Sequence, residues 1–156
     1  RSYRPRPDMT HDTAFGWAAR RALAALDRAA VDAPDAFCRA YLDTGLLFTG
    51  LDELQVAESL LARALECEEG EARARVVLHY AGVLLRTQRS ADALAILRAG
   101  HEDYPDNYEI WLRLARTLAR TGRTAEAAQE YRDLLDQPDL DPRARPQVQR
   151  ELDAIT

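Results

Sequence analysis

The chain has 156 residues, of which 47% are hydrophobic and 30% are charged, a balance typical of a globular protein rather than a disordered chain. No apolar run approaches the roughly 18 residues that a membrane-spanning helix needs. All 21 basic side chains are arginine, which excludes lysine-dependent Schiff-base chemistry and P-loop phosphate binding. The net charge of −5 argues against a nucleic-acid partner.

Helical periodicity dominates the chain after a short N-terminal arm. The first residues are rich in arginine and proline, so residues 1–12 are expected to form a flexible basic arm. Strand signals are nearly absent, whereas apolar residues recur at three-to-four spacing from about residue 13 onward. Asp52, Ser90, Asp106 and Thr124 are the expected capping or opening residues. We expect helices over about 13–31, 36–50, 52–66, 71–86, 90–103, 107–120, 124–136 and 144–155.

The sequence repeats at an offset of 34 residues. An earlier unit, from about residue 38 to residue 70, follows the same pattern with an insertion of about two residues. The repeating unit is therefore a helix-turn-helix pair. The positions that match in apolar or small character are Val77 with Trp111, Tyr80 with Leu114, Ala81 with Ala115, Leu84 with Leu118, Ala93 with Ala127, and Leu97 with Tyr131.

The stretch WLRLARTLARTGRTAEAAQEYRDLL, from Trp111 to Leu135, resembles the tetratricopeptide repeat family, bacterial type. Gln88 stands where the family has a turn glycine, and Leu118 stands where tyrosine is usual. The resemblance covers about residues 15–141. It implies an all-α fold, a right-handed superhelix of antiparallel helix pairs, with about three repeats between an N-terminal helix and a C-terminal capping helix. One domain is expected over residues 13–156.

Residues that could carry chemistry are scattered. His11, His79 and His101 fall in different expected elements, and no zinc-hydrolase or nucleophile-elbow motif occurs. We therefore expect no enzyme activity, no metal and no cofactor. Cys38 and Cys67 are expected at neighbouring helix ends as reduced thiols, with a disulfide as the alternative. The expected location is the cytoplasm, with the periplasm as the alternative.

The resemblance also implies a place for binding, because the first helix of each family repeat lines a concave surface. These first helices are together net basic, whereas the second helices are net acidic. Arg75 and Arg113 have acidic residues four positions earlier, Glu71 and Glu109, whereas Arg86, Arg116 and Arg120 have none. Leu42 and Leu46 are expected to be partly exposed on the same surface. The expected partner-binding residues are Arg75, Leu78, Leu85, Arg86, Leu112, Arg113, Arg116 and Arg120.

These observations predict a non-enzymatic module that binds an acidic peptide or helix with apolar anchors in a concave groove. One alternative is a self-associating scaffold, in which the basic arm of one molecule meets the acidic outer surface of another. That surface would carry Glu58, Glu66, Glu126 and Glu130. A second alternative is an accessory domain of a larger enzyme or of a secretion or assembly protein.

Overall fold

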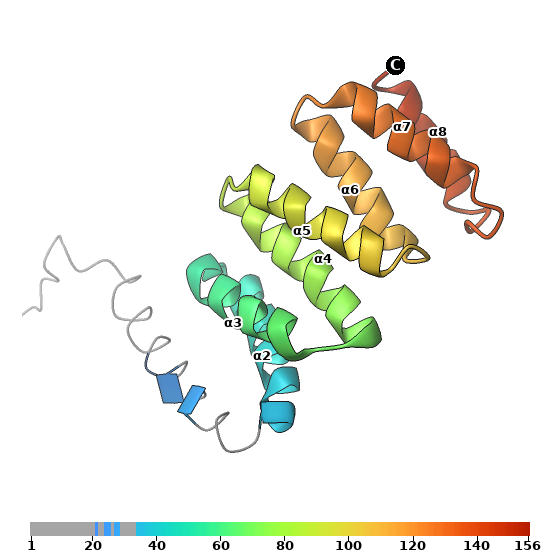
Figure 1. The fold of residues 1–156 in the computed structure, drawn as a ribbon. Coiled ribbons are helices and arrows are strands. Elements are labelled where there is room, and N and C mark those ends of the chain that lie inside the picture. The colour runs from blue at the N-terminus through green and yellow to red at the C-terminus, as the bar shows by residue number, and fades with distance from the viewer. Residues whose placement is uncertain (1–20, 22–23, 26, 29–33) are drawn as a thin grey trace, which may run out of the picture. The chain divides into compact units, whose positions relative to one another are not determined.

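A computed structural model describes residues 21, 24–25, 27–28 and 34–156. The expected arm over 1–12, and most of the expected helix over 13–31, lie outside these residues. The described residues form seven helices and no strand, which confirms the all-α class. The chain divides into two compact units, Arg1–Glu68 and Glu69–Thr156, and each is described by itself (Figure 1). Within the described residues, no helix has both the length and the apolar character needed to cross a membrane.

In the first unit, α2 (Pro34–Gly50) and α3 (Leu54–Cys67) form a hairpin. Small residues let the two helices approach closely: a Cβ atom added to Gly45 would lie 3.0 Å from Cγ of Leu61. Ala57 and Leu61 are completely buried between the helices. Small residues such as Gly45 and Ala57 thus allow the close approach, and bulky side chains such as Leu60 and Leu61 fill the core of this unit.

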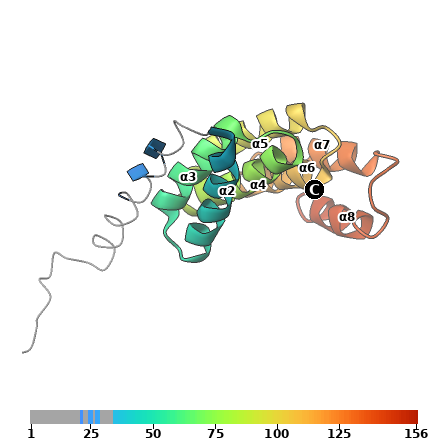
Figure 2. The ribbon, with the colours of Figure 1, turned by 90° about the horizontal axis from the view of Figure 1, so that it is seen from below.

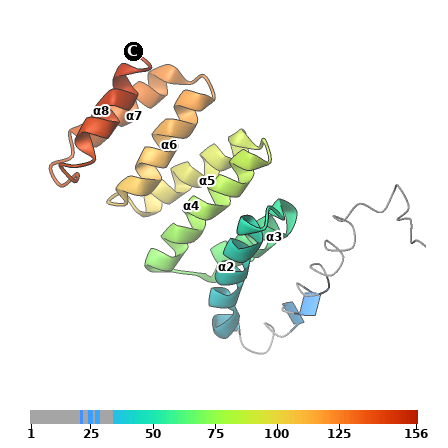
Figure 3. The ribbon, with the colours of Figure 1, turned by 180° about the vertical axis from the view of Figure 1, so that it is seen from behind.

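The second unit contains α4 (Gly70–Arg86), α5 (Ser90–Asp103), α6 (Tyr108–Arg120), α7 (Thr124–Leu135) and α8 (Arg145–Asp153). Each helix packs on the next, and α4 also packs on α6 (Figures 1 and 3). The chain returns after α7 through a loop that brings α8 beside it (Figure 2). Among the described glycines, Gly100 leaves the least room, since an added Cβ atom would lie 2.6 Å from Cγ1 of Val77.

The turns between paired helices confirm the repeat register. Each contains one residue with a left-handed backbone, namely Asp52 (φ 64°), Gln88 (φ 64°) and Gly122 (φ 80°). After each of them, a backbone N–H bonds five residues back, to the carbonyl of Phe48, Leu84 or Leu118, at 2.8–3.0 Å. This bond is the one that closes a helix in a Schellman motif. The middle repeat therefore makes the same turn as the third, although it has glutamine in place of glycine.

The repeated core positions are buried as the pattern predicts, except Tyr80, which is half-buried. Three capping predictions are wrong. Asp52 occupies the left-handed turn position instead of capping α3, and Ser90 is the first helical residue of α5 rather than its cap. Asn107 caps α6 in place of Asp106, because its side-chain oxygen accepts from the Ile110 N–H at 3.1 Å.

The structure corrects the prediction of reduced thiols. Cys38 lies in the first turns of α2 and Cys67 is the last residue of α3, so hairpin packing brings them together, as expected. The two residues form a disulfide, with their Cα atoms 5.7 Å apart. The expectation of reduced thiols gave more weight to a core that needs no covalent link than to the neighbouring helix ends, which the hairpin brings to bonding separation.

Candidate functional site

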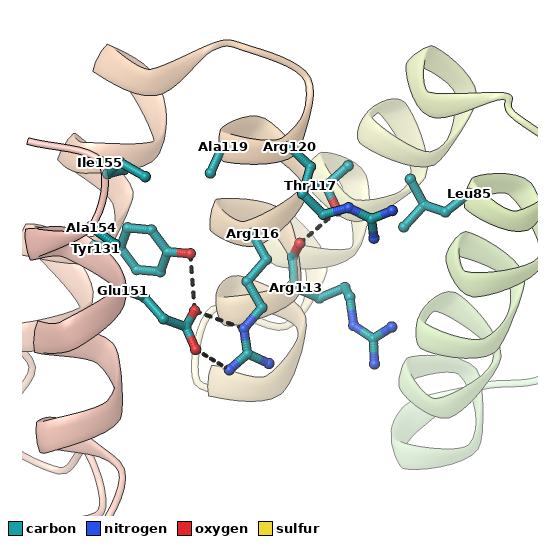
Figure 4. Close-up of a pocket in the computed structure, with 10 residues that line it drawn as sticks. All are labelled: Leu85, Arg113, Arg116, Thr117, Ala119, Arg120, Tyr131, Glu151, Ala154 and Ile155. Carbon is teal, nitrogen blue, oxygen red and sulfur yellow. Dashed lines mark hydrogen bonds and ion pairs between the residues drawn. The ribbon is translucent and has the colours of Figure 1, made fainter.

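A groove on the second unit contains half of the expected binding residues. It has a volume of about 480 Å³ and lies over α6, with α4 on one side and α8 on the other (Figure 4). We call it the α6 groove. Its lining residues are Leu85 from α4, Arg113, Arg116, Thr117, Ala119 and Arg120 from α6, Tyr131 from α7, and Glu151, Ala154 and Ile155 from the C-terminal helix and the turn after it.

The amphipathic character of α6 sets the position of the arginines. Trp111, Leu114 and Leu118 are buried on one side of the helix. Residues three, four and seven positions apart share a helix face, so Arg113, Arg116 and Arg120 emerge together on another side. This shared face was correctly predicted from their spacing.

Arg116 has an acidic partner, contrary to the sequence prediction. Its Nη2 lies 2.5 Å from Oε1 of Glu151 and its Nε lies 2.8 Å from Oε2, so the guanidinium holds the carboxylate with two bonds. The hydroxyl of Tyr131 donates to the same carboxylate at 3.0 Å. The bond from Arg116 holds the pKa of Glu151 below its usual value despite partial burial. Burial and the bond to Glu151 raise the pKa of Tyr131. Glu151 therefore attaches α8 to both α6 and α7.

Arg113 and Arg120 are placed differently. Figure 4 shows both side chains extending from α6 on the side of Leu85, whereas Arg116 extends to Glu151. Arg113 is half-buried and Arg120 is exposed. Over residues 34–156, no ion pair neutralises either guanidinium, and the expected pairs Glu71–Arg75 and Glu109–Arg113 do not form. The groove therefore presents two unneutralised cations beside apolar side chains.

The other expected binding residues lie outside the groove lining. Arg75 and Arg86 are exposed on α4, and Leu112 is half-buried on α6. Leu78 is only 9% exposed and Leu42 is completely buried, so the prediction that these leucines are exposed anchors is wrong. Helical spacing placed them on the first-helix surface, but packing by neighbouring helices covers them.

The sequence prediction missed the contribution of the C-terminal helix. Val148 and Leu152 are buried, as expected for a cap, but Glu151 and Ile155 also line the groove. In the sequence, Glu151 is visible only as an acidic residue between the apolar residues Val148 and Leu152. Its partner, Arg116, is 35 residues away, so no local pattern joins them.

Two residues of the acidic second-helix surface, Glu126 and Glu130, have partners within the second unit. Glu126 bonds to Arg123 at 2.6 Å and to Arg98 at 2.9 Å, and Glu130 accepts from the Trp111 indole at 2.7 Å. The two arginine contacts hold the pKa of Glu126 below its usual value. The two arginines therefore neutralise Glu126, whereas the indole of Trp111 is uncharged and leaves the negative charge of Glu130 in place.

A second arginine–carboxylate–tyrosine contact occurs in the first unit. Arg63 on α3 holds Asp27 with two bonds of 2.6 and 2.7 Å, and Tyr41 on α2 donates to the same carboxylate at 2.9 Å. The bond from Arg63 holds the pKa of Asp27 below its usual value. Asp27 is thus attached to both helices of the hairpin, as Glu151 is to α6 and α7.

The comparison with protein families supports the repeat interpretation over part of the chain. Residues 84–146 match a family model of the tetratricopeptide repeat. The matched region contains α5, α6 and α7, and with them Arg113, Arg116 and Arg120 of the groove. No curated protein is significantly similar to the chain. Repeats of this family generally mediate protein–protein interaction.

Proposed function

We propose that the chain is a non-enzymatic interaction module, and that the α6 groove binds an acidic segment of a partner protein through apolar anchors. The observation that carries the proposal is the placement of Arg113 and Arg120, which lack a carboxylate partner among residues 34–156 and flank an apolar wall. An acidic ligand would supply the carboxylate partners that the two guanidinium groups lack.

The apolar side chains supply the second part of the recognition. Leu85 and Ile155 are half-buried and line opposite sides of the groove. Exposed ion pairs contribute only about 0–1 kcal/mol each, so the affinity depends on apolar contact as well. The arginines then steer the encounter and set the orientation of the ligand.

An array of synthetic peptides tests the proposal. The peptides carry a leucine flanked by acidic, neutral or basic residues, and the full chain is the probe. We expect binding to the acidic leucine peptides, lost in the Arg113→Glu, Arg120→Glu double variant. The charge-matched control is Arg132→Glu with Arg143→Glu, since both residues are exposed and lie outside the groove.

Circular dichroism establishes that each variant is folded before binding is compared. For a bound acidic peptide, the groove double variant slows association and reduces its salt dependence, while Leu85→Ala speeds dissociation. Preferential binding of basic peptides, or equal loss of binding in the control, would show that the α6 groove is not the binding surface.

A further inference from the structure

We infer that the ligand of the α6 groove presents two acidic side chains three residues apart in an extended, polyproline-II-like backbone, with an apolar residue between them. This inference rests on the proposed function and specifies its ligand. It follows from the spacing of the unneutralised arginines, the walls of the groove and the position of its apolar side.

The two unneutralised arginines have a fixed backbone separation along α6. Arg113 and Arg120 are seven residues apart, which corresponds to about 10.5 Å at 1.5 Å per residue. Seven residues are also nearly two full turns, so both side chains leave the same side of the helix. Arg116 lies between them in sequence, but Glu151 already neutralises its charge. The groove therefore recognises two carboxylates rather than three.

An extended ligand matches this separation. A polyproline-II chain rises about 3.1 Å per residue with three residues per turn, so positions i and i+3 are about 9 Å apart on the same side. In a β-strand, positions i and i+3 point to opposite faces, so only one of the two acids would reach α6. A helical ligand would need acids at i and i+7 to span the same distance.

The walls of the groove favour the extended chain over a helix. The α4 helix packs on α6, and the Arg116–Glu151 ion pair ties α8 to α6. A helix with its side chains is about 10–12 Å across. A single extended chain is narrower than a helix, so it suits a groove of about 480 Å³ between α4 and α8 better. The residues between the two acids point away from α6, so one of them meets Leu85, the wall towards which Arg113 and Arg120 extend (Figure 4).

Fluorescence anisotropy with labelled glycine–serine peptides tests the spacing directly. The reference peptide carries one Glu-Leu-Pro-Glu segment, and proline favours the extended backbone. One comparison peptide carries the same residues as Glu-Glu-Leu-Pro, and another separates the acids by six residues. Since one exposed ion pair contributes at most about 1 kcal/mol, we expect each altered spacing to weaken binding by up to about fivefold.

Single variants then assign each acid to one arginine. Replacing one glutamate of the peptide by glutamine should weaken binding less in the Arg113→Gln variant than in the parent chain. Replacing the other glutamate should likewise weaken binding less in the Arg120→Gln variant. Equal affinity for all acid spacings, with binding still lost in the double charge reversal, would refute the two-site inference and leave the proposed function standing. A double charge reversal that changed neither the affinity nor the preference among peptides would refute both.

Discussion

Two helical glycines allow the packing of the second unit to be tested with a single type of substitution. Gly82 lies within α4, and a Cβ atom added there would have no neighbour within 4 Å. Gly100 lies within α5, where the same atom would lie 2.6 Å from Cγ1 of Val77 and 3.5 Å from Cγ2 of Ile110. Alanine at the two positions should therefore have opposite effects on stability.

The magnitudes follow from the local geometry. Alanine in place of an unhindered helical glycine stabilises a helix by about 0.5–1 kcal/mol, so Gly82→Ala should raise the free energy of unfolding by that amount. At Gly100 the same gain is outweighed, because α5 must move away from α4, and overpacking of a core costs about 1–3 kcal/mol. We expect Gly100→Ala to be destabilising by about 1–2 kcal/mol after the helix gain is included.

Urea unfolding of the full chain followed by circular dichroism measures both effects. The second variant Val77→Ala removes the methyl groups that meet the new Cβ atom, so Gly100→Ala should cost less in the Val77→Ala background than in the parent chain. Equal stabilisation by both glycine substitutions would mean that α4 and α5 are not in close contact at Gly100.

Three further outcomes are expected. Mass spectrometry of the non-reduced protein should show the loss of two hydrogens, and reduction of the bond between Cys38 and Cys67, which are 29 residues apart, should destabilise the first unit by about 3–4 kcal/mol. In urea unfolding, Gln88→Gly should raise the free energy of unfolding by about 1 kcal/mol because φ is 64° there, whereas Gly122→Ala, at φ 80°, should lower it by a similar amount. The pKa of Glu151 is lower in the folded chain than its ordinary value of 4.5, so Glu151 adds about 1 kcal/mol to the free energy of unfolding above pH 4.5. This stabilisation is lost as the pH falls through the folded pKa. In a pH series of urea unfolding curves, Glu151→Gln should remove that part of the acid dependence.

The sequence was sufficient for the repeat fold because each repeat carries its own structural information. Alanine at positions 81, 93, 115 and 127 recurs with a fixed offset, and each of these side chains is completely buried. The turn after α4 forms without glycine because the hydrogen bond five residues back and the packing of both helices hold Gln88 in its unfavourable backbone conformation. A substitution in the motif therefore did not change the turn.

Helix capping and side-chain exposure were less predictable from the sequence. The choice of a capping residue depends on a shift of one residue, and exposure depends on packing by distant parts of the chain. Asp106 and Asn107 are adjacent and both are good capping residues, so composition alone could not choose between them. Leu78 and Leu85 are seven residues apart on α4 and share a face, yet Leu78 is buried and Leu85 lines the groove. Which leucine is covered depends on the neighbouring helices rather than on helical spacing.

The arginines of α6 show what residue spacing can and cannot predict about the candidate site. Spacing predicted the helix face of the site, but it could not predict which of the three arginines is neutralised. That Arg113, Arg116 and Arg120 share a face is a property of one helix and follows from 3.6 residues per turn. That Arg116 is neutralised depends on a chain reversal after α7 that brings Glu151 within 2.5 Å. A ligand that binds the groove must then either match the two remaining cations or displace Glu151 from Arg116 and Tyr131. Displacement would break two charge-assisted bonds and the tyrosine bond, so a ligand that matches Arg113 and Arg120 is favoured.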